Sequence, residues 1–288
     1  MTIATVKSRL RTTGRHAALD GLSALGRLSG RESAGLATPR VQFPYLHAVP
    51  ENEEHSFRKL LGSLATTHTF VSYSEAVRRV RSGEIDRPYL ALSFDDGFAS
   101  NVRTARLLEE FGIVGCFFVT TGFIGTPTLT EARDFFGYSA GIDEPAMTWS
   151  DLEALKAAGH EIGNHTQTHR VVSSLSPQRV VDEIGGAADV LRARLGSVEH
   201  FAWPFGRFFH FTGDAARVVF DTGHLSCASA ERGAHLSAEG ASADSLCIRR
   251  EHIMTSWPRR HSRYFLSRSA LRGAPSAQGW PAGWEVSR

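Results

Sequence analysis

The most informative segment of the chain is Pro88-Tyr89-Leu90-Ala91-Leu92-Ser93-Phe94-Asp95-Asp96-Gly97. Its first seven residues are mainly apolar, and they predict a buried strand at 88–94. Two acids and a glycine follow at the point where that strand ends. In sheets built from alternating strands and helices, ligand chemistry collects at the carboxyl ends of the strands. The stretch therefore predicts both an element of a sheet and a polar site at its edge.

Outward from this strand, short apolar runs alternate with helical patterns. The expected strands lie at 113–119, 160–165, 198–203 and 224–229, and the expected helices at 101–111, 150–158, 177–195 and 213–221. The helix near 150 takes Ser150 as its cap and ends at Gly159. At least five such alternations predict an α/β protein with a mostly parallel sheet, either open or closed into a barrel.

Composition limits the possible partners. The 288 residues are 42% hydrophobic and 22% charged, as in ordinary globular proteins, and the formal charge of +2 is small, so we expect no nucleic-acid partner. The three cysteines are widely spaced in apolar segments, which favours buried free thiols over disulfides.

The first 40 residues differ from the rest in charge, with seven Lys or Arg residues against two acids. Basic residues interrupt any secretory signal, and no run is long enough to span a membrane, so a cytoplasmic protein is expected. The simpler interpretation of 1–40 is a solvated, partly disordered basic arm. The alternative is peripheral contact of this arm with an anionic membrane.

A second polar cluster, His165-Thr166-Gln167-Thr168-His169, follows another expected strand. Histidines four residues apart lie on one side of a helical turn, and with a carboxylate they can hold a divalent metal. Asp95 and Asp96 point to opposite sides of an extended segment, so one can bind the metal while the other remains free as a base. Each motif alone is more often a turn or a surface pair, so the prediction rests on their occurrence together at strand ends.

These two motifs, together with Phe201-Ala202-Trp203-Pro204-Phe205-Gly206, resemble the NodB-homology polysaccharide deacetylases, carbohydrate esterase family 4. The resemblance extends from about residue 41, where Tyr45-Leu46-His47 looks like the opening strand of the family, to about residue 270. It implies a catalytic domain at 41–270, followed by a C-terminal tail at 271–288. The implied fold is a distorted (β/α) barrel.

The resemblance also implies roles for individual residues. Asp95 corresponds to the general base, and a divalent metal, usually zinc, is held by Asp96, His165 and His169. The backbone N–H of Phe205 faces the oxyanion. Independently of the resemblance, aromatic rings can stack on a sugar face, and of the aromatic residues around this motif we expect only Trp203 and Phe205 near the site, with core packing as the alternative role of such residues. The implied reaction removes acetyl from an N-acetylated sugar in a glycan or glycolipid precursor.

Two positions depart from the family pattern. Ala202 stands where many relatives carry the arginine that orients the base, and we expect Arg250 or Arg249 to replace it, with Arg207 as a further candidate. His252 is displaced from the usual place of the acid histidine, and His224 and His210 are rivals for that role. These departures leave two alternatives open, a non-catalytic metal-containing carbohydrate-binding protein and an O-acetyl esterase.

Overall fold

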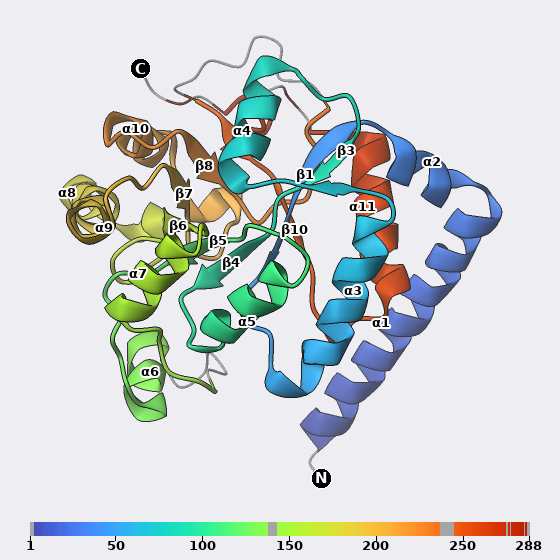
Figure 1. The fold of residues 1–288 in the computed structure, drawn as a ribbon, viewed down its shortest axis with the longest axis horizontal. Coiled ribbons are helices and arrows are strands. Elements are labelled where there is room, and N and C mark those ends of the chain that lie inside the picture. The colour runs from blue at the N-terminus through green and yellow to red at the C-terminus, as the bar shows by residue number, and fades with distance from the viewer. Residues whose placement is uncertain are drawn as a thin grey trace.

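A computed structural model describes residues 3–137, 143–236, 245–274, 276, 278–284 and 286, with side chains from residue 14 onward. Helices surround one sheet of ten strands (Figure 1). The strands are β1 Arg40–Leu46, β2 Thr69–Phe70, β3 Pro88–Leu90, β4 Ser93–Asp96, β5 Cys116–Val119, β6 Glu161–Asn164, β7 His200–Ala202, β8 Ser226–Ala228, β9 Cys247–Ile248 and β10 Arg250–His252. The helices are α1 Ile3–Leu28, α2 Arg31–Ala37, α3 Glu54–Ala65, α4 Tyr73–Ser82, α5 Ser100–Glu109, α6 Leu129–Phe136, α7 Trp149–Ala157, α8 Pro177–Val181, α9 Ala187–Leu195, α10 Gly213–Asp221 and α11 Arg259–Arg272.

All pairings between the strands are parallel, which confirms the expected α/β sheet. The order is β2-β3-β1-β4-β5-β6-β7-β8-β9, and β10 pairs with β1. β9 and β10 are separated only by Arg249, yet β9 joins β8 while β10 joins β1. This break makes the structure a distorted barrel and not a regular closed one.

Two expected boundaries need correction. The single strand expected at 88–94 is two strands, β3 and β4, interrupted at Ala91 and Leu92, and both pair with β1. The helix expected to begin at a Ser150 cap begins at Trp149 instead. Its cap is Thr148, which forms a reciprocal capping box with Asp151. The pattern Thr148-x-x-Asp151, which begins two residues before Ser150, is therefore the signal that starts the helix.

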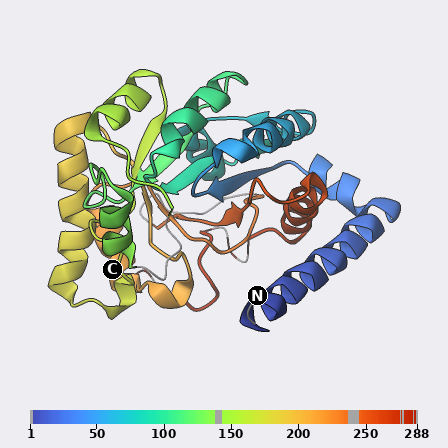
Figure 2. The same ribbon diagram turned by 90° about the horizontal axis from the view of Figure 1, so that it is seen from below.

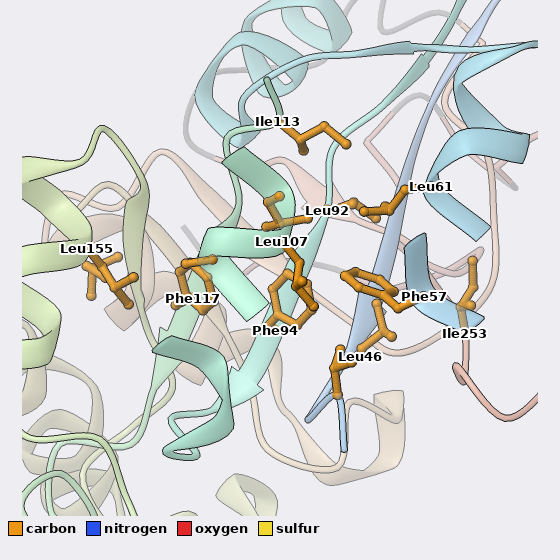
Figure 3. Packing of buried hydrophobic residues seen from close by; sticks show 14 of the residues in the cluster. Leu46, Phe57, Leu61, Leu92, Phe94, Leu107, Ile113, Phe117, Leu155 and Ile253 are labelled. Atoms are coloured by element: carbon orange, nitrogen blue, oxygen red, sulfur yellow. The ribbon is translucent and has the colours of Figure 1, made fainter. Parts of the chain in front are cut away.

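The alternation of side chains along the strands determines which residues face the interior of the barrel. In β4 and β5, Phe94 and Phe117 stack with ring centroids 5.2 Å apart and pack with Leu107 and Leu155 beneath the outer helices (Figure 3). The neighbouring Phe118 packs on the other side of the sheet, in the cluster that contains Phe43 and Ile248. Asp95 is in register with Phe118. The period of two thus directs Asp95 toward the barrel interior.

The N-terminal segment, which we expected to be a partly disordered arm, contains the two helices α1 and α2. Both contact α11, which lies between α1 and the sheet (Figure 2). Asp20 of α1 accepts a hydrogen bond from Arg260 Nε at 2.5 Å and lies 2.6 Å from Nε2 of His261. These ion pairs join segments 240 residues apart, so the local apolar pattern of α1 did not reveal them.

The described part of the C-terminal tail also packs on the domain. Trp280 is buried and stacks against Trp203, with ring centroids 6.0 Å apart. Among the described residues, no helix combines the length and the apolar character that crossing a bilayer requires.

Candidate active site

Asp95 and Asp96 occupy the carboxyl end of β4, and both are nearly inaccessible to solvent. Asp96 has a φ of 78°, in the left-handed region that non-glycine residues seldom adopt. Thr166, His169 and Phe205 also have positive φ angles, of 68°, 55° and 62°. Strained residues of this kind cluster where the surrounding structure holds them for function.

Asp96 forms a compact group with His165 and His169. Its Oδ1 lies 3.4 Å from Nε2 of His165 and 3.1 Å from Nε2 of His169. Potential ligand atoms of the three residues all lie within 4.8 Å of one another. Nδ1 of His165 is 2.7 Å from the Ala202 carbonyl, so its N–H donates there and Nε2 is the ring nitrogen that faces Asp96.

The two histidines are brought together by a loop, and not by the helical turn that we expected. The backbone reverses through the left-handed Thr166 and His169. Asn164 Oδ1 accepts a hydrogen bond from the Thr166 N–H at 2.9 Å, and Thr166 Oγ1 accepts one from the His169 N–H at 3.2 Å. Side chains of the loop itself therefore satisfy the backbone groups that a helix would have paired.

Glu183 supports this loop from outside and was missed in the sequence. It lies in the π-helical turn Asp182–Gly186 between α8 and α9 and is completely buried. Its carboxylate accepts hydrogen bonds from the N–H groups of Gln167 at 3.1 Å and Thr168 at 2.7 Å. No local motif marks Glu183, because the turn and the loop meet only when β6 and the following helices pack.

Arg250 forms a buried bidentate pair with Asp95. Its two terminal nitrogens donate to Oδ1 and Oδ2 at 2.7 and 2.8 Å. Burial alone would raise the pKa of Asp95, but the charges of Arg250 and His165 outweigh it and hold that pKa below its usual value. Arg249 donates instead to the Gly279 carbonyl, and Arg207 pairs with Glu231. Of the three candidate arginines, Arg250 is therefore the one that contacts Asp95.

These groups line a cleft of about 670 Å³. Its described lining includes His252 and His47, whose ring centroids are 5.8 Å apart. Burial, with the nearby charges of His47 and Arg232, lowers the pKa of His252 to about 4. His47 was expected only to belong to the opening strand, and no site role was predicted for it. His47 directly follows the last residue of β1, and a polar residue at the end of a strand is also the feature that indicated Asp95.

The rival histidines lie elsewhere. His224 is buried beside Asn164 and the Val219 carbonyl, at 3.3 and 3.0 Å, and is not among the described residues that line the cleft. His210 is next to the ring of Phe205, with centroids 5.4 Å apart.

The two aromatic residues expected near the sugar differ in accessibility. Phe205 is 51% exposed, and its ring lies 5.0 Å from that of His169. Trp203 lines the cleft but is 0% exposed. Its ring stacks on Phe211 with centroids 4.5 Å apart, and its indole N–H donates to the Arg207 carbonyl. Trp203 therefore lies at the wall of the cleft as expected, with its ring packed between Phe211 and Trp280.

Comparison with known proteins agrees with this architecture. Residues 82–223 match the polysaccharide deacetylase family. The fold is similar to IcaB from Ammonifex degensii, with 20% identity over 79% of this chain and 97% of that one and a TM-score of 0.63. It is also similar to the Streptococcus pyogenes deacetylase PplD in complex with acetate, with 18% identity over 80% and 99% of the two chains and a TM-score of 0.62.

A third similar structure is the de-N-acetylase from Aggregatibacter actinomycetemcomitans, with 16% identity over 78% of this chain and 99% of that one and a TM-score of 0.60. The family match spans the strand that carries Asp95 and Asp96, the loop of His165 and His169, and the turn after β7. Residues 82–223 therefore belong to the polysaccharide deacetylase family, hydrolases that act on carbon–nitrogen bonds other than peptide bonds, and the chain shares the fold of the structures named above.

Proposed function

We propose that this protein removes the acetyl group from an N-acetylated sugar of a glycan or glycolipid precursor, and that a divalent metal takes part. The observation that carries the proposal is the buried ion pair of Asp95 and Arg250 directly beside the group of Asp96, His165 and His169. The two neighbouring carboxylates thus have different partners, because Asp95 is paired with Arg250 whereas Asp96 faces the two histidines.

The residues present fit a metal such as zinc. Oδ1 of Asp96 is buried and has no hydrogen-bond partner among the described residues, although two imidazole nitrogens face it. One carboxylate oxygen and two imidazole nitrogens are ligands that zinc accepts with a position left open. When bound there, the metal would supply Lewis acidity toward a carbonyl and make water more acidic.

The protein's own groups then divide the proton chemistry. Asp95 stays ionised because of Arg250, and its orientation is set by the bidentate contact, so it can accept a proton from the attacking water. The leaving amine needs a proton donor. His252 and His47 both line the cleft, and the low pKa of His252 keeps it neutral at pH 7 until it receives a proton.

Acetate release from N-acetylglucosamine oligomers and from glycolipid precursors, with and without a chelator, tests the proposal. Replacing Asp95 with asparagine should abolish release while zinc binding, followed by calorimetry, is retained. Asp134→Asn on the exposed side of α6 is the matched control. Full activity after complete metal removal would exclude the metal mechanism, and undiminished turnover of Asp95→Asn would remove Asp95 as the base.

The arginine contact also bears on the non-catalytic alternative. That alternative rested partly on Ala202, but Arg250 contacts the carboxylate that the missing arginine would have oriented. Binding of sugars without any acetate release would nevertheless favour it. Faster release from O-acetylated than from N-acetylated sugars would instead favour an esterase.

A further inference from the structure

The face formed by α1, α2 and α11 carries a charge that is unlike the rest of the chain. Residues 3–39 and 259–272, which hold the three helices, contain eleven Lys or Arg residues against two acids, a net charge of +9, whereas the whole chain carries +2. The remaining residues therefore carry −7. Because α1 lies on the outside of the molecule, beyond α11, this charge is concentrated at one edge (Figures 1 and 2).

Both acids of this face are paired, so each offsets one arginine and leaves the other arginines in excess. Asp20 is paired with Arg260, and Glu32 is buried and paired with Arg263 at 2.9 Å. The two pairs join α11 to α1 and α2, and the Asp20–Arg260 pair is partly exposed. Arg27, Arg31, Arg268 and Arg272 are exposed.

The same face has an exposed apolar row. Leu22, Leu25 and Leu28 are 45%, 63% and 88% exposed and recur every three residues, so they lie along one side of α1. Leu271 of α11 is 45% exposed. In a protein whose other leucines are mainly buried, such a row marks a surface that contacts another apolar medium.

Leucines and arginines meet in one groove between the helices. This groove, of about 260 Å³, is lined by Leu22, Leu25 and Leu271 together with Arg31, Arg268 and Arg272. Guanidinium groups beside an apolar floor match the chemistry of a phospholipid, whose phosphate lies next to its acyl chains. Arginines alone would suit any polyanion, but the leucines select a bilayer over a nucleic acid.

We propose that the α1–α2–α11 face docks on an anionic membrane surface. The leucines enter the boundary between headgroups and acyl chains, and the arginines contact lipid phosphates. Docking is peripheral, and it is independent of the reaction assigned to the cleft.

The test measures co-sedimentation of the full chain with vesicles of phosphatidylcholine, alone or mixed with phosphatidylglycerol. We expect binding only to the mixed vesicles and release at high salt, because screening weakens surface electrostatics. Arg268→Gln should lower the partition coefficient about fivefold and Arg268→Gln/Arg272→Gln about 25-fold. Leu25→Ser/Leu28→Ser should lower it about tenfold.

Matched controls lie on other faces. Arg106→Gln on α5 and Val190→Ser on α9 change an exposed arginine and a 42% exposed aliphatic residue, and both should bind like the unaltered protein. Circular dichroism verifies folding of every variant.

The proposal is overturned if the protein does not bind mixed vesicles at low salt. It is also overturned if the variants of the face and the control variants lose vesicle binding equally. A third contrary result is a dimer that Leu25→Ser/Leu28→Ser dissociates while the protein does not bind vesicles. The last result would assign the face to a second copy of the chain. None of these readouts depends on deacetylation.

Discussion

Arg250 holds both carboxylate oxygens of Asp95, at 2.7 and 2.8 Å, although the two residues are 155 positions apart in the sequence. The contact exists because β10 and β4 both pair with β1, which places Arg250 opposite Phe43 and Ser93 opposite Tyr45. The guanidinium also lies 4.4 Å from the centre of the Tyr45 ring. Its planar shape and delocalised charge suit both contacts at once.

Replacing Arg250 with lysine should lower acetate release about 100-fold, because a single ammonium cannot fix both carboxylate oxygens and the base loses its orientation. Arg249→Lys is the control, since Arg249 contacts the Gly279 carbonyl and not Asp95. That variant should lose thermal stability while kcat stays within about threefold, given that no reacting group moves. Equal losses of kcat in the two variants would show that orientation of Asp95 is not what Arg250 provides.

Glu183→Gln should weaken zinc binding about 10- to 100-fold, the range typical of residues that support metal ligands from outside. The neutral glutamine side chain would accept weaker hydrogen bonds from the Gln167 and Thr168 N–H groups than the charged carboxylate does. The loop that carries His169 would therefore be held less firmly. Calorimetric titration with zinc measures the effect. Asp182→Asn, a neighbour in the same turn with an exposed side chain, should bind zinc normally. Unchanged affinity in Glu183→Gln would limit that residue to a role in folding.

Phe205 and Trp203 should respond in opposite ways to replacement by alanine. Phe205→Ala should raise KM about tenfold with little change in melting temperature, because an exposed ring at the cleft supplies a stacking surface for a sugar. Trp203→Ala should reduce the free energy of unfolding by about 3–5 kcal/mol, as expected for a large buried side chain. Urea unfolding and steady-state kinetics of both variants measure these effects. A higher KM without a loss of stability in Trp203→Ala would show that Trp203 contacts the sugar.

His200 should contribute to acid instability. Burial, assisted by His224 and Arg81, lowers its pKa from 6.5 to about 3, so the unfolded chain binds a proton below pH 6.5 that the folded chain does not. Stability therefore falls as the pH falls from 6.5 toward 3, by up to about 1.4 kcal/mol per pH unit from this group. His200→Gln should make the curve of unfolding free energy against pH shallower in this window. Parallel curves for the two proteins would contradict the buried neutral state.

Local patterns were sufficient where the chemistry lies at the end of a strand. The apolar run before Asp95 and Asp96 and the strand before His165 predicted a parallel sheet with polar residues at its carboxyl edge, and the sheet is confirmed. Local patterns failed where a residue's surroundings are built from distant segments. Glu183 carries no motif, and the burial of Trp203 depends on Trp280 from the last part of the chain.

Hydrophobic period and turn chemistry act over a few residues, so local patterns in the chain predict the alternation of strands and helices, the motifs shared with the family, and the residue types that meet at the strand ends. The packing of distant strands is what brings Arg250, and not Arg249 or Arg207, to Asp95. Neighbouring residues on a strand point to opposite faces, and the pairing of β10 with β1 selects which of them faces the interior. The position of α1 likewise depends on distant residues, since Asp20 contacts Arg260 and His261 of α11.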